Sequence, residues 1–497
     1  MRTVRVLLLA GSSLVLLTAS PAFATRGVGP TITHGVVVGD VRAGSATLWA
    51  RGSGAGVLQV RLAGGAHRAV QPIELTADHD YTGRLDLMGL RPETNYRYRA
   101  WVSAGPPGRG QGPEVTGVFR TAPSENDRSS VRLAFGGDIS GQNVCRDDVD
   151  GIPIAKTIDA WDPDIFVGLG DMIYADDVCL SVGRYGNAQI PRAQAQATDL
   201  TGFWAHWRYN RADPGLRSLL ASTAYVGVWD DHEVVNDFGP LTDTRATPPY
   251  DPTVHLMPLG RQAFLDYTPV TGDPADPNRL YRSIRYGADL ELIVLDTRQY
   301  RAANSALDDQ AQPKSMLGVE QLAWLKETLA ASTATWNVVV SSVPMSIPTG
   351  FPSTNGRDGW ANFDQATGFE RELLDILRSA RQSGAVNLFW ITTDVHFAEA
   401  FRYTPFADAP EFHVYEIATG PMNSGIFPNR DFDPTLSPER LAFVGPGAAT
   451  DVTTWEQAKS WFNFGTLEID ADGTLDAAIV DTSGDRRFEL ELQPSSR

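Results

Sequence analysis

The chain has 497 residues, of which 42% are hydrophobic, as is usual for a globular protein of several domains. Its formal net charge is −18, from 60 acidic and 42 basic residues. This balance argues against specific nucleic-acid binding and against coating of anionic membranes, because both need a basic surface. It also disfavours an anionic substrate, unless bound cations reverse the charge locally.

Residues 1–24 have the pattern of a secretory signal peptide. Arg2 and Arg5 precede the mostly apolar stretch Val6–Leu17, and Ala22–Ala24 fits a small-x-small cleavage site. A membrane anchor is the alternative, but the apolar stretch is too short to span a bilayer. We therefore expect a protein with no transmembrane segment that is secreted, periplasmic or associated with the cell wall.

The sequence contains two cysteines, Cys145 and Cys179. Both are expected in loops that follow successive strands. In an exported protein a disulfide is the default expectation. A metal thiolate site or two free thiols are the alternatives.

An all-β domain is predicted at residues 27–122. Short alternating runs such as Tyr96–Val102 recur between glycine- and proline-rich turns, at a spacing typical of an immunoglobulin-like sandwich. The stretch Leu90–Tyr98 resembles the turn and tyrosine-bearing strand of fibronectin type III domains. The polar segment Thr121–Ser130 is the predicted boundary.

From residue 131 to residue 492 the pattern changes to strands that alternate with helices, which predicts an α/β domain. Val131–Phe135, a helix at Ile154–Trp161 and Ile165–Leu169 form the first βαβ unit. Further strands are expected at Ala224–Val228, Leu280–Arg285, Leu290–Leu295, Trp336–Ser341, Ala385–Ile391, Phe412–Ala418, Gly465–Ile469 and Thr474–Ile479. Further helices are expected at Leu200–Leu220, Gly260–Tyr267, Val319–Ala330 and Phe369–Arg381.

Four predicted strand ends carry side chains that could bind metal ions. They are Asp138, Asp171 with Tyr174, Asp231 with His232, and Asp394 with His396. A loop cap or a turn would explain any one of them. Because ligands of open α/β sheets bind at the carboxyl ends of the strands, all four together favour a metal site.

The donor types restrict the metals. One set mixes oxygen and nitrogen donors and suits Fe(III), with Mn and Zn acceptable: Asp138, Asp171, Tyr174 and His396. Asp231, Asp394 and a shared Asp171 offer oxygen only, which favours Ca, Mg or Mn. Two such ions would neutralise several carboxylates, so an anionic substrate could bind.

Hydrolysis of a phosphate ester fits this arrangement, because two metal ions bind phosphoryl oxygens and generate an attacking hydroxide from water. The leaving alkoxide needs a proton, and His232, one residue after Asp231, is the candidate donor. The alternative is a histidine that only orients Asp231.

Several motifs together resemble the alkaline phosphatase D family of the calcineurin-like metallophosphoesterases. They are G-D-M-I-Y (170–174), W-D-D-H-E-V (229–234), L-D-T-R-x-Y-R (295–301), Q-x-x-W-L (321–325) and D-x-H (394–396). Tyr174 after Gly-Asp is similar to the iron-binding tyrosine of purple acid phosphatases. The resemblance implies a four-layer αββα core behind the sandwich, an iron-plus-calcium site, and hydrolysis of phosphodiesters and phosphomonoesters, with phospholipase D-like activity possible.

The resemblance also implies residue roles. The first metal would be held by Asp138, Asp171, Tyr174 and His396, the second by Asp171, Asp231 and Asp394, and His232 would be catalytic. The chain departs from the family pattern at Asp138, where a cysteine is common, and at Thr393, where Gly-Asp-x-His has glycine. The pair Ser341-Ser342 replaces Asn-Gln, which could open a coordination position to water.

The expected substrate is a small-molecule or polymeric phosphate ester. A non-catalytic extracellular protein that is loaded with calcium and holds a surface ligand is the alternative. Retention of both His232 and His396 argues against that alternative, because a binding module needs neither. The oligomeric state stays open.

Overall fold

The computed structural model describes residues 29–64, 70–105, 110–272, 276–311, 314–350 and 353–495. The predicted signal peptide, residues 1–24, lies outside these ranges. No helix within them is long and apolar enough to cross a membrane.

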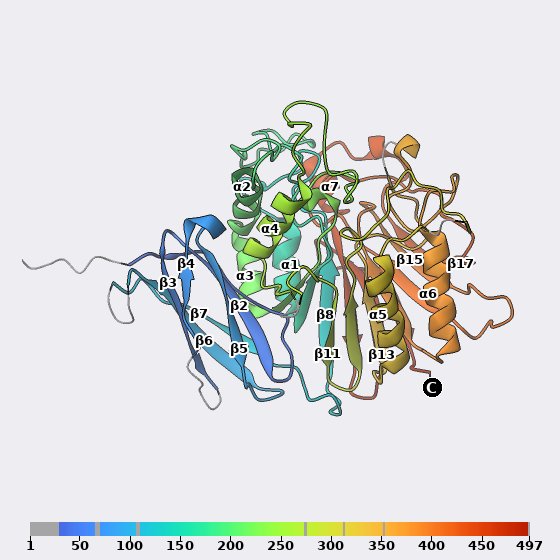
Figure 1. Cartoon of the computed structure of the whole chain (residues 1–497), viewed down its shortest axis with the longest axis horizontal. Coiled ribbons are helices and arrows are strands. Elements are labelled where there is room, and N and C mark those ends of the chain that lie inside the picture. The colour runs from blue at the N-terminus through green and yellow to red at the C-terminus, as the bar shows by residue number, and fades with distance from the viewer. Residues whose placement is uncertain are drawn as a thin grey trace, which may run out of the picture.

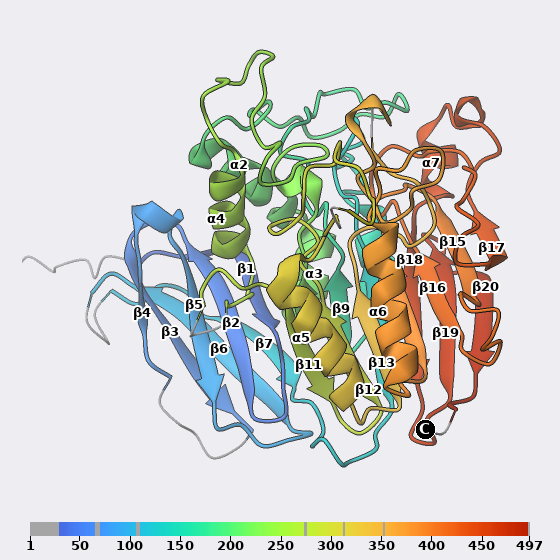
Figure 2. The same cartoon turned by 45° about the vertical axis from the view of Figure 1, so that its right-hand side comes forward.

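Two large β-sheets face each other, and helices cover the outer face of each, so the α/β part has four layers (Figure 1, Figure 2). The nine-stranded sheet has the order β20 (Arg486–Leu492), β19 (Leu475–Asp481), β18 (Asn463–Ile469), β8 (Val131–Gly136), β9 (Ile165–Gly168), β10 (Ala224–Gly227), β1 (Ile32–Gly39), β2 (Ser45–Gly52), β5 (Thr82–Met88). The seven-stranded sheet has the order β11 (Arg282–Tyr286), β12 (Leu290–Val294), β13 (Trp336–Val340), β14 (Leu388–Thr392), β16 (Val414–Ala418), β15 (Ala398–Tyr403), β17 (Pro438–Val444). The expected αββα core is confirmed.

Strand side chains alternate between the two faces of each sheet, and this alternation builds the layers. In β13, Val338 and Val340 pack into the core between the sheets, whereas Val339 packs beneath the outer helices. The nine-stranded sheet is covered by α1 (Pro153–Trp161), α2 (Leu200–Arg211), α3 (Pro214–Ser222), α4 (Met257–Tyr267) and the short α7 (Trp455–Lys459). The other sheet is covered by α5 (Gly318–Ala331) and α6 (Glu370–Gln382).

The single helix expected at Leu200–Leu220 is two helices. Asp213 caps α3, with its carboxylate accepting the Leu216 N–H at 2.9 Å, and Pro214 occupies the first turn. Proline lacks a backbone N–H and clashes with the preceding turn, so α2 ends and a new helix begins at this point.

The N-terminal sandwich has a second sheet of four strands in the order β4 (Ile73–Leu75), β3 (Gly56–Ala63), β6 (Asn95–Ser103) and β7 (Val115–Arg120). Its other sheet, β1-β2-β5, continues the nine-stranded sheet, because β1 pairs in parallel with β10 through Val38↔Ala224 and Gly39↔Tyr225. The all-β fold is therefore confirmed, and the sandwich is joined to the parallel strands of the α/β part by backbone hydrogen bonds.

Side chains strengthen this junction. Arg282 donates to both oxygens of Asp40 at 2.7 Å, and the indole of Trp49 donates to the Asp266 carbonyl at 2.7 Å.

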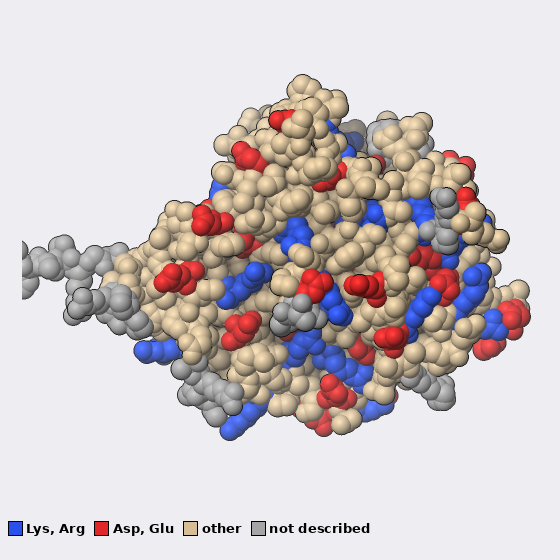
Figure 3. Space-filling view, viewed as in Figure 1, with Lys and Arg blue, Asp and Glu red and all other residues tan. Residues whose placement is uncertain are grey.

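On the face shown in Figure 3, acidic and basic residues are intermixed, so no broad basic surface of the kind that binds nucleic acid covers that face.

A disulfide joins Cys145, in the loop after β8, to Cys179, in the loop after β9. Both cysteines are buried, and the expected pairing is confirmed. The disulfide therefore ties together two loops that each carry predicted metal ligands, Asp138 and Asp171.

Replacing both cysteines by serine should lower the free energy of unfolding by about 3–4 kcal/mol, because the closed loop of 34 residues restricts the unfolded chain. The measurement is urea unfolding of the oxidised protein and of the Cys145→Ser/Cys179→Ser variant. A reducing agent should lower the midpoint of the wild type and leave that of the variant unchanged. Equal midpoints for the two oxidised proteins would contradict the prediction.

Candidate metal centre

The loops at the carboxyl ends of the parallel strands converge between the two sheets. Asp138 follows β8, Asp171 follows β9, and Asp394 and His396 follow β14. These four residues have positive φ angles of 63°, 51°, 80° and 61°. Left-handed backbone is uncommon for residues other than glycine and concentrates at functional sites, where the surrounding structure maintains it.

One group of donors consists of Asp138, Tyr174 and His396, all buried. The hydroxyl oxygen of Tyr174 lies 2.8 Å from Nε2 of His396 and 3.2 Å from Oδ1 of Asp138. Nε2 of His396 lies 3.6 Å from the same Asp138 oxygen. Donors about 2.1 Å from a shared ion lie roughly 3–3.6 Å from one another, so this group fits a single cation.

The surroundings of His396 orient its ring and keep it neutral. Its Nδ1–H donates to the Gly425 carbonyl, which leaves the lone pair of Nε2 facing Tyr174 and Asp138. Burial is the main reason that the pKa of His396 falls to about 3, so the imidazole is neutral. Burial also raises the pKa of Asp138 to about 7, against the hydrogen bond from Thr393.

A second group consists of four carboxylates, from Asp171, Asp230, Asp231 and Asp394. One oxygen from each lies within 4.8 Å of the others. Each also has a buried oxygen that no donor within the described residues reaches: Asp171 Oδ2, Asp230 Oδ2, Asp231 Oδ1 and Asp394 Oδ2. Buried carboxylate oxygens are normally hydrogen-bonded, so these oxygens are suited to a cation.

The pKa values of these carboxyl groups also indicate that the group is suited to a cation. Burial is the largest cause of the raised pKa of Asp171 and of Asp394, and neighbouring carboxylates raise both further. Burial likewise raises the pKa of Asp230 to about 6. Anionic groups so close together repel one another in a medium of low dielectric, and a bound divalent cation would relieve that repulsion.

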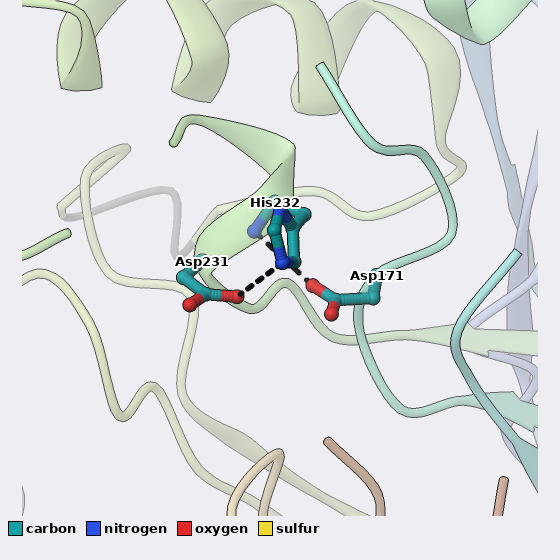
Figure 4. Close-up of side chains that lie close together, drawn as sticks. All are labelled: Asp171, Asp231 and His232. Carbon is teal, nitrogen blue, oxygen red and sulfur yellow. Dashed lines mark hydrogen bonds and ion pairs between the residues drawn. The ribbon is translucent and has the colours of Figure 1, made fainter. Parts of the chain in front are cut away.

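His232 lies beside Asp171 and Asp231 of the second group (Figure 4), and it contacts Tyr174 of the first. Its Nδ1 is 2.6 Å from Oδ1 of Asp176, its Nε2 is 3.9 Å from Oδ1 of Asp231, and its ring stacks on Tyr174 with centroids 4.0 Å apart. Burial disfavours the imidazolium, but Asp176, Asp231 and Asp171 outweigh it and hold the pKa of His232 well above its ordinary value.

Glu233 and Arg298 support the acidic residues. The carboxylate of Glu233 accepts the backbone N–H groups of Asp171 and Asp230, at 3.0 and 2.7 Å, and so fixes the loops that present both side chains. The guanidinium of Arg298 is fully buried, lies 2.6 Å from Oδ1 of Asp230 and makes two 2.8 Å bonds with Asp358.

The structure thus brings together all seven predicted residues, in two adjoining groups. Sequence reasoning missed Asp230, Asp176 and Arg298. The Asp230-Asp231 pair in W-D-D-H-E and the arginine in L-D-T-R are the signals that could have indicated Asp230 and Arg298. Nothing in the sequence distinguished Asp176 from the neighbouring loop acids.

Thr393 and Ser342 occupy two of the positions at which the chain departs from the family pattern. The Thr393 hydroxyl donates to Oδ2 of Asp138 at 2.6 Å. Asp138 is also a position at which the chain differs from the family pattern, so two of the differing residues are in direct contact. Ser342 donates to Oδ1 of Asp230 at 2.6 Å, so its hydroxyl is engaged with the second group.

Comparisons with known proteins agree with this architecture. The family model described as PhoD-like phosphatase matches residues 134–474, and the model of the PhoD-like phosphatase N-terminal domain matches residues 18–123. Alkaline phosphatase D of Bacillus subtilis (strain 168) is 28% identical over 251 residues. That match covers 47% of this chain and 41% of the length of the curated relative.

Two solved structures share the fold. One, described as the structure of PhoD, has a TM-score of 0.70 and 19% identity, with 96% of this chain and 94% of that chain covered. A purple acid phosphatase from yellow lupin (Lupinus luteus) seeds has a TM-score of 0.61 and 12% identity, with 93% of this chain and 74% of that chain covered. The PhoD-like phosphatase model matches more than half of the residues of this chain. The chain therefore belongs to the PhoD-like phosphatase family.

Proposed function

We propose that this phosphatase is an exported two-metal phosphoesterase that hydrolyses phosphodiesters, phosphomonoesters or both. Export is supported by the buried disulfide between Cys145 and Cys179 and by the predicted signal peptide. The observation that carries the catalytic proposal is the set of buried, unpartnered carboxylate oxygens beside the Asp138–Tyr174–His396 group.

We assign the first ion, Fe(III), to Asp138, Asp171, Tyr174 and His396, and the second ion, Ca, to Asp171, Asp231 and Asp394. Mn, Zn and Mg are the alternatives. Asp230 supplies a further carboxylate oxygen next to the second group. When bound, the ions supply Lewis-acid polarisation of the phosphoryl group and lower the pKa of water at the site.

His232 is the proposed general acid, and its own contacts define the proton that it donates. Asp176 faces Nδ1 at 2.6 Å, so that nitrogen carries the hydrogen that orients the ring. Nε2 faces Asp231 and is the atom that would protonate the leaving oxygen. The stack on Tyr174 keeps the imidazole plane fixed beside the first group.

The purified full-length chain should hydrolyse bis(p-nitrophenyl) phosphate, and a chelator should abolish the activity. Readdition of Fe, Ca or Mn should restore it, because the acidic residues cannot act on a phosphodiester without cations. The measurement is p-nitrophenol release before chelation, after it and after readdition. Absence of turnover under all metal combinations would favour the calcium-loaded binding protein instead.

His232→Ala should reduce kcat by about 10²-fold or more, because a general acid contributes on that scale. Metal content should stay near that of the wild type, since His232 is assigned no metal. The control is His255→Ala, a surface histidine whose side chain is 69% exposed, which should leave kcat within roughly twofold. Loss of metal in parallel with activity would make His232 a metal ligand or a structural residue.

Thr393→Val should weaken binding of the first metal by about 10–100-fold, because valine keeps the shape but removes the hydrogen bond that orients Asp138. Thr393→Ser keeps the hydroxyl and should retain the affinity. The measurement is competition between the protein and a chelator of known affinity. Equal affinities for the valine and serine variants would show that the hydrogen bond has no part in holding the metal.

A further inference from the structure

A cavity lies at the junction between the N-terminal sandwich and the α/β part, where α4 packs beside β5 (Figure 1, Figure 2). Its volume is about 600 Å³, which is in the range of sites for small molecules. Arg84, on β5, lines it from the sandwich, and Arg261, on α4, lines it from the α/β part. A ligand in this cavity would therefore contact both parts of the chain.

The cavity is separate from the metal centre. None of the seven predicted residues of that centre lines it. Arg261 and Leu265 are four residues apart, so they lie on one face of α4, and both border the cavity. Gly260 lies on another face of the helix, where a Cβ atom would meet the Glu233 carbonyl at 2.6 Å. The helix therefore contacts the turn that carries His232 with a face other than the one at the cavity.

The two arginines are partly buried, and within the described residues neither forms an ion pair. Their hydrogen-bond acceptors are neutral. Nη1 of Arg84 donates to the Val270 carbonyl. Arg261 donates to Oε1 of Gln299 at 2.9 Å and to the Pro277 carbonyl at 2.8 Å. These contacts hold both side chains in place and leave both positive charges without a counter-ion.

Several donors of this pair are also left over. Nε and Nη2 of Arg84 and Nη1 of Arg261 have no hydrogen-bond partner in the part of the chain that the structure describes. Among the described residues, Asp266 is the one acid that lines the cavity. One of its oxygens accepts the indole N–H of Trp204 at 2.8 Å, and the other lies 2.8 Å from Nδ1 of His79. Its carboxylate is therefore already engaged.

Two like charges in one partly buried cavity are unfavourable unless an anion joins them. Burial is the largest cause of the lowered pKa of Arg84 and of Arg261. The charge of Arg261 lowers the pKa of Arg84 further, against the attraction of Asp266 and Asp86. An anion with several oxygens suits the unused donors, because guanidinium groups donate paired hydrogen bonds to phosphate and similar groups.

We propose that this cavity binds a small organic molecule that carries a phosphate-like dianion. The dianion lies between Arg84 and Arg261, and the apolar body of the molecule lies on Met257, Pro258 and Leu265, which also line the cavity. Apolar walls with a few convergent polar groups are typical of sites for such ligands. The site is additional to the metal centre and does not depend on the proposed function.

Phenylphosphonate and methylphosphonate test both parts of the site, because they carry the same dianion and only the first has a ring. Their binding to the metal-loaded full-length protein is measured by isothermal titration calorimetry at constant ionic strength. The wild type should bind one more phenylphosphonate per chain than the Arg84→Gln/Arg261→Gln variant. At the cavity, phenylphosphonate should bind about 10-fold more tightly than methylphosphonate, because its ring removes more apolar surface from water.

Either phosphonate can also bind at the metal centre, and competitive inhibition of bis(p-nitrophenyl) phosphate hydrolysis reports that second binding event alone. The inhibition constant should be the same for the wild type and the Arg84→Gln/Arg261→Gln variant, because neither arginine lines the metal centre. The matched control is Arg97→Gln/Arg378→Gln, which removes two exposed arginines elsewhere and should keep the wild-type stoichiometry.

Equal stoichiometry in the wild type and the Arg84→Gln/Arg261→Gln variant would overturn the proposed site, as would an equal loss in the control. The unfolding midpoint without ligand shows whether each variant is folded. If the double variant is unfolded, Arg84→Gln alone should weaken binding at the cavity by about 10-fold, the scale for one charge-assisted hydrogen bond. An unchanged affinity in that variant would equally overturn the site.

Discussion

The central constraint in this protein is the convergence of buried carboxylates that the described side chains neutralise only in part. Asp171, Asp230, Asp231 and Asp394 each keep a buried oxygen that no described donor reaches. Burial raises the pKa of Asp171 and of Asp394, and the neighbouring acids raise both further. A bound cation would relieve the repulsion among these groups, and the positive φ angles of Asp171 and Asp394 show left-handed backbone at two of the positions that present them.

Glu233 and Arg298 act on different parts of this group. Glu233 fixes the backbone of two of the acidic residues, and Arg298 neutralises only one oxygen of Asp230, so the oxygens that face the centre stay free. The chain as a whole carries a net charge of −18, which would repel an anionic ester. Cations bound at the carboxylates would reverse the charge where an anionic ester would bind.

Much of the centre could be predicted from sequence, because Asp138, Asp171 and Asp394 directly follow apolar parallel strands whose ends meet at one edge. The partner of His232 could not, since several acids lie in the loop after Tyr174 and only the fold selects Asp176. The contact between Thr393 and Asp138 joins positions 255 residues apart, and no local pattern reveals it. Alternation likewise predicted the sandwich strands but not that β1 would pair with β10, because alternation specifies faces and not partners.

The most direct test of the account is a crystal structure of the protein loaded with metal, with anomalous scattering measured on both sides of the iron edge. We expect one anomalous peak that changes across that edge, bounded by Asp138, Tyr174 and His396. A second cation should lie among Asp171, Asp231 and Asp394. Ordered side chains with no cation in either group, in protein that retains phosphoesterase activity, would contradict it.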